Sequence, residues 1–239
     1  MSKVYYCSFK EEMDNLAMFE PEPLTKVLTK EWSGKEAEFL FQCPAFSQEL
    51  KNTYIIRAPL SITAKFEKEK GWHITNLNLA QESFNDLFRL VPNHKGQLML
   101  DVIQFFTHHG QHLFFSEEPT TMQLLCPTFH KTGMSSFPLI LGSFEIDKWI
   151  RPIGYACINE NKEDMVVKRG DPLFYVKFHS NTKTTLHKFN LTQSIKDIVS
   201  GGLKIKTFAP RSSLSRLYDM FVRSGNNKRI LREIKKQHE

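Results

Sequence analysis

The stretch from Leu113 to Phe178 constrains the fold most, because short apolar segments follow one another there with turn residues between them. It ends in Met165–Val167, a Gly170–Pro172 turn and the alternating segment Leu173–Phe178. Short runs rich in β-branched and aromatic residues, bounded by Gly, Pro and Asp, are typical of strands in β-rich domains. Their even spacing predicts a mainly β (α+β) fold, either an antiparallel barrel or a distorted, jelly-roll-like sandwich.

Similar segments upstream extend this prediction. We expect strands at Val4–Phe9, Ala37–Gln42 and Thr53–Ala58, and a hairpin across Ser61–Leu77. A second hairpin is expected to join Leu98–Phe106 to Gln111–Phe115. One internal helix is predicted at residues 79–90, where Phe84, Leu87 and Phe88 share a face.

Alternation in the last strand predicts which of its faces is buried. Phe174, Val176 and Phe178 share one face, and Tyr175 and Lys177 share the other. Because successive side chains of a strand point to opposite faces, we expect the second face to be the wetter one.

The hydrophobic period changes after residue 190, which divides the chain into a body (1–190) and a C-terminal tail (191–239). Leu191–Val199 predicts a short helix that ends at Gly201-Gly202. From Ser212 an amphipathic helix is expected, followed by a short basic helix over Lys228–Gln237. We expect the body to fold without the tail beyond residue 202.

Charge is concentrated in this tail. Residues 201–239 hold ten Lys and Arg against three acids, a net charge of +7, whereas the whole chain carries +6. A near-neutral body is not built as a nucleic-acid groove, but a basic tail can anchor a protein partner or nucleic acid. The expected partner-binding residues are Arg216, Arg223, Lys228, Arg229, Arg232, Lys235 and Lys236.

Other features predict the compartment. The four cysteines show no Cys-x-x-Cys spacing, and the N-terminal region lacks the long apolar run of a secretion signal. No window approaches eighteen apolar residues, so no membrane contact is expected. These features indicate a cytoplasmic protein with free thiols, and a homo-oligomer is compatible with them.

Three histidines form the densest group of metal-capable side chains. His108, His109 and His112 lie near an expected strand end, with Glu117 and Glu118 downstream. Imidazoles with a carboxylate can bind iron or zinc, although the carboxylate usually found one or two residues after the first His is missing. A polar hairpin turn explains the cluster as well. No cofactor is predicted, and iron or zinc is the alternative.

The segment Gly142–Arg151 is the place in the body where chemistry is most expected. Glu145 and Asp147 would project on one side of an extended segment, where paired carboxylates can hold a metal or orient a water. Arg151 can bind an anion. The competing interpretation is a loop whose charged side chains pair with one another, with the Trp149 side chain filling the space beneath it.

Two similar tetrads lie 83 residues apart, Cys43–Phe46 and Cys126–Phe129. Each follows an expected strand, so they are interpreted as corresponding corners in two halves of the fold.

These tetrads, with Lys51–Ile56, Leu141–Pro152 and Lys168–Phe178, resemble an uncharacterised conserved protein family of marine T-even-like phages. The resemblance covers most of residues 38–190. It implies a phage origin, hence the cytoplasm of an infected bacterium, and implies no activity.

A weaker likeness is to the trimeric dUTPase and dCTP deaminase superfold. Gly170-Asp171 and Phe178 match a later motif of that superfold, but Glu145 stands where its catalytic Asp is expected and Lys148 replaces its Tyr. Pro210–Ser213 matches its Pro-Arg-Ser-Ser motif, yet follows these elements instead of preceding them. The likeness implies a similar order of strands without that catalytic set.

The sequence therefore predicts a phage-encoded accessory protein, a non-catalytic interaction module whose basic tail docks on a partner or nucleic acid. Two alternatives stay open. One is a metal- or nucleotide-dependent enzyme, oxygenase-like or dUTPase-like, and the other is a structural component of the virion.

Overall fold

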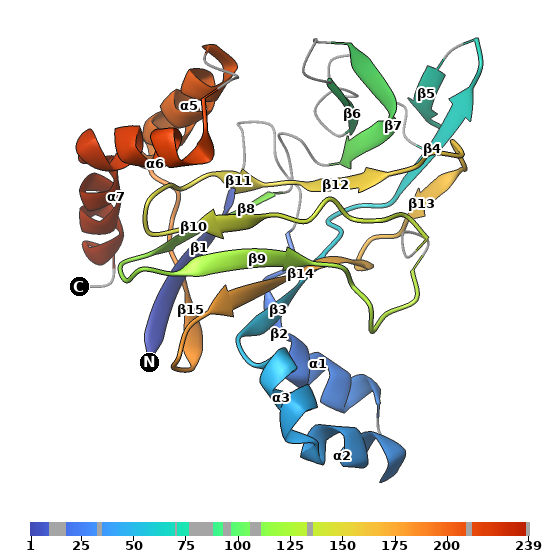
Figure 1. The fold of residues 1–239 in the computed structure, drawn as a ribbon, viewed down its shortest axis with the longest axis horizontal. Helices are drawn as coiled ribbons and strands as arrows, with labels where there is room; N and C mark the ends of the chain where they lie inside the picture. Colours follow the sequence, from blue (N-terminus) through green and yellow to red (C-terminus); the bar gives the residue numbers. More distant parts are fainter. Residues whose placement is uncertain are drawn as a thin grey trace.

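The protein is mainly β, with several sheets and a few helices (Figure 1). The computed structural model describes residues 1–9, 18–32, 35–69, 71–76, 88–92, 97–105, 111–132, 136–208 and 212–237. The described strands close no barrel, and the arrangement is sandwich-like. The predicted fold class is confirmed in its sandwich form.

The first central sheet has four strands. Their order is β11 (Pro152–Ile153), β8 (Gln111–Ser116), β1 (Ser2–Phe9) and β15 (Thr184–Lys188). β1 runs antiparallel to β8 and parallel to β15. The N-terminal strand therefore lies between two strands that are far apart in the sequence.

The second central sheet has five strands, all antiparallel to their neighbours. Their order is β10 (Ser143–Glu145), β9 (Thr121–Leu125), β14 (Pro172–His179), β3 (Thr53–Arg57) and β2 (Glu22–Pro23). The turn before β14 forms as predicted, with Gly170 at a φ of 88° and the Asp171 carboxylate accepting the Lys168 N–H at 2.9 Å.

Two three-stranded sheets extend the sandwich at one end (Figure 1). One is β12 (Tyr155–Ile158), β7 (Leu98–Phe105) and β6 (Phe88–Pro92), and the other is β13 (Met165–Val167), β4 (Ile62–Glu67) and β5 (Gly71–Ile74). β4 and β5 form the hairpin expected at residues 61–77.

Two predictions for this region are wrong. β7 and β8 are not a hairpin, because β7 pairs with β6 and β12 while β8 pairs with β1 and β11. β8 is buried along its whole length, so it takes a central place with a neighbour on each side. The end of the helix expected at 79–90 is also wrong, since Phe88 begins a strand, and residues 77–87 lie outside the described part.

The sandwich core lies between the two central sheets. Val4 and Tyr6 of β1 and Phe114 of β8 face Phe174 and Phe178 of β14 within one buried cluster. The neighbouring residues along β1 point to the opposite face, as the two-residue period of a strand requires. Tyr5, Cys7 and Phe9 are also buried, so β1 has an apolar outer face that needs its own cover.

Helices α1 (Leu24–Glu31), α2 (Lys35–Gln42) and α3 (Pro44–Leu50) lie beside the second sheet (Figure 1). Their apolar cluster includes Ile55 and Tyr175 on the outer face of that sheet. Tyr175 is therefore only 1% exposed, so the prediction of a wetter face is wrong at Tyr175, which helices cover, and holds at Lys177, which is partly exposed.

The strand predicted at Ala37–Gln42 is helix α2. Phe41 packs on Trp32 and Phe46, whereas Phe39 is 74% exposed. In a strand these two Phe residues would share a face, but in a helix they point in different directions.

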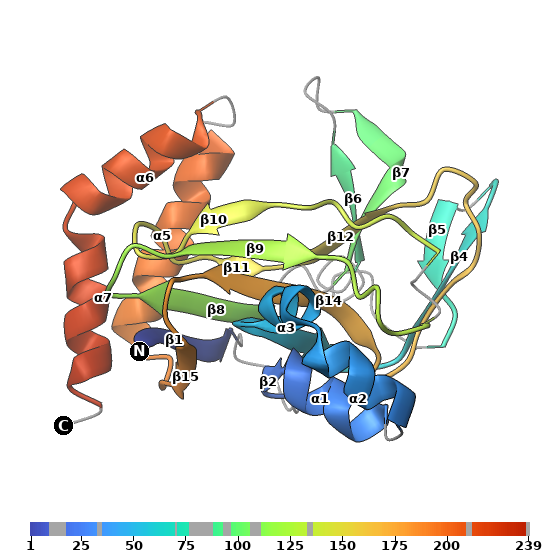
Figure 2. The ribbon, with the colours of Figure 1, turned by 60° about the horizontal axis from the view of Figure 1, so that its bottom comes forward.

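Helices α5 (Gln193–Phe208), α6 (Leu214–Arg223) and α7 (Asn226–Lys235) cover the outer face of the first sheet (Figure 2). Ile198, Phe221 and Ile230 belong to the same buried cluster as Tyr5 and Phe115. This packing argues against a body that folds without the tail, but that expectation and the boundary at residue 190 both stay predictions.

Helix α5 also runs through Gly201 and Gly202, where the sequence predicted its end. A Cβ at Gly202 would lie 3.0 Å from the indole nitrogen of Trp149, so glycine at this position allows helix α5 to approach Trp149 closely. Tertiary packing of Ile195 and Val199 overrides the low helix propensity of the glycine pair.

The shared cluster predicts how the tail unfolds. Ile230 is 0% exposed, so replacing it with Ala should lower the free energy of unfolding of the whole protein by about 2–4 kcal/mol. We expect one cooperative transition in urea, followed by far-ultraviolet circular dichroism and by tryptophan fluorescence. Val222→Ala, at a residue 39% exposed in the same helical region, is the control and should cost less than about 1 kcal/mol. A separate early transition confined to the helical signal would contradict a shared core.

Candidate functional site

The seven predicted partner-binding residues lie on α6, on α7 and directly after α7, and all seven are exposed. The opposite faces of the helices are buried through Leu217, Tyr218 and Phe221 in α6 and through Ile230 and Ile234 in α7. Amphipathic helices anchored in this way direct their charged side chains to solvent. The core therefore fixes the direction in which the cations point.

Two of these cations form ion pairs. Nζ of Lys235 lies 2.6 Å from Glu117 Oε1, and the hydrogen bond to Glu117 raises the pKa of Lys235. Nζ of Lys236 lies 3.5 Å from Glu233. Within the described residues, no acidic side chain pairs with Arg216, Arg223, Lys228, Arg229 or Arg232.

A groove of about 410 Å³ follows α7. The described residues that line it are Lys228, Leu231, Arg232, Lys235 and Lys236, of which four are cationic. Residues spaced by three, four and seven positions share one helix face, and the seven steps from Lys228 to Lys235 cover about 10 Å of helix. Phosphates of one strand follow each other at about 3.4 Å of helix rise. The groove thus presents a row of cations on the scale of a few nucleotides.

The prediction that Glu145 and Asp147 project on one side of an extended segment is wrong. β10 ends at Glu145, and residues 146–148 form a turn. The Glu145 carboxylate accepts a hydrogen bond from Lys148 Nζ at 2.9 Å. The Asp147 carboxylate accepts the backbone N–H of Thr120 at 3.3 Å. Each carboxylate serves a separate local contact.

Arg151 stacks on two aromatic rings. Its guanidinium carbon lies 5.0 Å from the centre of the Phe144 ring and 5.4 Å from that of Trp149. Burial lowers the pKa of Arg151, although the group stays cationic.

Helix α6 docks on this same corner. The Tyr218 hydroxyl accepts the backbone N–H of Glu145 at 3.0 Å, and its ring meets Trp149 edge-on at 6.2 Å. Helix α6 thus packs directly on the charged segment Gly142–Arg151.

His112 lies within β8 and is almost fully buried. Its Nε2 is 3.1 Å from the carbonyl oxygen of Phe19, which requires a proton on Nε2. Its Nδ1 has no hydrogen-bond partner among the described residues. Burial lowers the pKa of His112 to about 4, with a smaller contribution from Lys188.

His108 and His109, the other two metal candidates, lie outside the described residues. Among the residues that are described, no group of three His, Cys, Asp or Glu side chains is placed to hold a metal ion.

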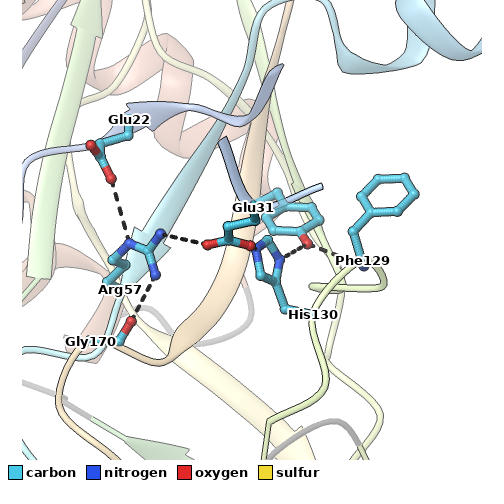
Figure 3. A network of polar contacts seen from close by, with 7 residues as sticks. Glu22, Glu31, Arg57, Phe129, His130 and Gly170 are labelled. Carbon is cyan, nitrogen blue, oxygen red and sulfur yellow. Dashed lines mark hydrogen bonds and ion pairs between the residues drawn. The ribbon is translucent and has the colours of Figure 1, made fainter. Parts of the chain in front are cut away.

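Sequence reasoning missed a polar network between α1, the loop after β9 and the second sheet (Figure 3). The Tyr175 hydroxyl is 2.6 Å from His130 Nδ1 and accepts the backbone N–H of Phe129 at 3.2 Å. His130 Nε2 lies 3.0 Å from a Glu31 carboxylate oxygen. Burial lowers the pKa of His130, and in the neutral tautomer with the proton on Nε2 the ring accepts from Tyr175 at Nδ1.

Arg57 continues the network on the other side of Glu31 (Figure 3). Its guanidinium lies 3.8 Å from Glu31 and 3.6 Å from Glu22, and donates to the Gly170 carbonyl at 2.9 Å. Tyrosine, histidine and glutamate in series resemble a nucleophile relay, but burial encloses the Tyr175 hydroxyl and raises its pKa. The network therefore fastens helix α1 to the sheet.

The two similar tetrads meet near this network, although they are not equivalent corners. Pro44 begins helix α3, whereas Cys126–Phe129 is a loop after β9. The rings of Phe46 and Phe129 pack edge-on at 5.7 Å, and both contact Trp32.

Searches of protein families, of curated proteins and of solved structures found nothing that matches this chain. Among the described helices, none is both long and apolar enough to cross a membrane.

The burial of His112 predicts a pH dependence of stability. Its folded pKa of about 4 is below the unfolded value of about 6.5, so the stabilisation is complete above pH 6.5 and is lost as pH falls toward 4. The loss should reach about 3 kcal/mol, measured as the free energy of unfolding in urea.

A matched pair of variants isolates this effect. His112→Gln keeps a donor for the Phe19 carbonyl but does not titrate, so its stability should fall less over this pH range. His179→Gln, at an exposed residue, should follow the wild type. Parallel pH profiles of unfolding free energy for wild type and His112→Gln would show that His112 does not cause the loss of stability at low pH.

Proposed function

We propose that the chain is a phage-encoded, non-catalytic accessory protein that binds nucleic acid through the basic groove of α7. The observation that carries the proposal is the groove itself, in which Lys228, Arg232, Lys235 and Lys236 lie along one exposed face. The proposed origin rests on the sequence resemblance described above, which covers most of residues 38–190.

Electrostatics favours a polyanionic partner for this surface. Residues 226–237 hold five Lys or Arg and one acid. Each cation that meets a phosphate releases a condensed counterion, which drives binding without reading the base sequence. A protein partner with a flat apolar surface fits less well, because Leu231 is the one apolar side chain among the described residues that line the groove.

Anchoring of α7 in the core adds to this argument. Ile230 and Ile234 hold one side of the helix in the cluster behind the first sheet. A helix fixed in this way keeps its cations in place before binding, so less conformational entropy is lost when phosphates arrive. Lys228 and Arg232, which have no acidic partner among the described residues, are then available to phosphate groups.

Binding to a fluorescently labelled 20-nucleotide single strand and to its duplex tests the proposal, with anisotropy followed from about 50 to 200 mM salt. The variant Lys228→Gln/Arg232→Gln removes two unpaired cations of the groove. We expect the slope of log affinity against log salt to become shallower by about one for each removed cation.

The control variant is Lys26→Gln/Lys30→Gln, which makes the same change of charge on exposed positions of α1, away from α7 (Figure 2). Its salt slope should equal that of the wild type. Absence of binding at 50 mM salt, or equal losses in both double variants, would exclude a nucleic-acid role for α7.

A further inference from the structure

A second depression, of about 630 Å³, lies between α5, α6 and the start of α7. Its floor is apolar and buried, formed by Trp149, Ile198, Leu217 and Phe221. Two large apolar side chains, Ile205 and Met220, line it and are about 40% exposed. Small-molecule sites usually measure about 300–1,000 Å³ and are lined mainly by apolar groups with a few polar ones.

The indole of Trp149 places an unused donor in this depression. The Trp149 side chain is 3% exposed, and no described residue accepts a hydrogen bond from its N–H. Trp149 lines the depression, so its indole N–H is a donor that a ligand bound there can use. Gly202 leaves space beside Nε1 that a side chain would fill, because a Cβ at residue 202 would lie 3.0 Å from this nitrogen.

The charged side chains around the depression are not equivalent. Arg229 lines it without an acidic partner among the described residues. Asp197 also lines it, but its carboxylate already accepts a hydrogen bond from Gln193 at 2.8 Å. The Ser224 hydroxyl donates to the Phe221 carbonyl at 2.8 Å. Trp149 thus offers a neutral donor on the apolar floor and Arg229 a cation beside it, and Ser194 and Asn226 add polar groups to the lining.

We propose that this depression binds a small amphipathic anion. Its apolar body would lie on Trp149 and Phe221, with a hydrogen-bond acceptor toward the indole N–H and an oxyanion toward Arg229. A ligand of this kind satisfies a buried donor that otherwise lacks an acceptor and complements the unpaired charge. The proposal does not depend on nucleic-acid binding by the α7 groove.

The probe is 8-anilinonaphthalene-1-sulfonate, which carries an apolar aromatic body and a sulfonate, titrated into the full chain and followed by its fluorescence. N-phenyl-1-naphthylamine, the same body without the sulfonate, is the matched ligand. Wild type should bind both, and Arg229→Gln should weaken the sulfonate about tenfold while leaving the neutral ligand unchanged. Arg223→Gln, at an exposed residue of α6 that does not line the depression, should change neither affinity.

The two neighbouring glycines provide the second arm. Gly202→Ala places a methyl group against the indole nitrogen, whereas a Cβ at Gly201 meets nothing within 4 Å. Both changes raise helix propensity equally, so a difference between them reports on the indole. We expect Gly202→Ala to weaken both ligands at least about tenfold, and Gly201→Ala less than about twofold.

Trp149→Phe, which removes the N–H and keeps an aromatic ring, covers the case in which Gly202→Ala fails to fold. It should weaken the sulfonate about fivefold or more, with folding checked by circular dichroism. Failure of the wild type to bind either ligand would overturn the proposal. So would equal sulfonate affinity in wild type, Arg229→Gln and Trp149→Phe.

Discussion

The structure depends on the burial of both faces of its central strands. β1 directs Val4 and Tyr6 into the sandwich and Tyr5 and Cys7 outward, and all four are buried. β14 does the same with Phe174 on one face and Tyr175 on the other. Two sheets packed face to face cover only their inner sides, so each outer face requires a layer of helices. Helices α1–α3 and α5–α7 provide these layers.

This constraint turns the basic tail into a rigid surface. The apolar sides of α6 and α7 complete the core behind the first sheet, and their cationic sides must then face solvent. Helix α6 also contacts the segment Gly142–Arg151, where Tyr218 meets Glu145 and Trp149. Both proposed sites are consequences of this packing. One is the basic groove on the outside of α7, and the other is the apolar depression where α5 and α6 meet Trp149.

Local patterns were sufficient for part of the fold. The turn at Gly170, the strands on either side of it and the hairpin of β4 and β5 form where the sequence predicts them, because turn residues and alternation act over a few positions. The amphipathic period of α6 and α7 likewise revealed both helices and their cations.

The remaining features depend on contacts between distant residues. Gly201 and Gly202 predict a helix end by propensity, yet the packing of α5 against Trp149 keeps the helix intact. The partners of β8 are strands far away in the chain. The network of Glu31, His130 and Tyr175 joins three separate segments, so no spacing in the sequence marks it (Figure 3).

Native-state hydrogen exchange tests directly whether the C-terminal helices are part of the core. Amides of α6 and α7 near Phe221, Ile230 and Ile234 should exchange with opening free energies close to those of β1 and β8, because all of them share one buried cluster. If those helix amides instead exchange at rates near those of an unfolded chain while β1 and β8 stay protected, the helices are an appendage and the account is contradicted.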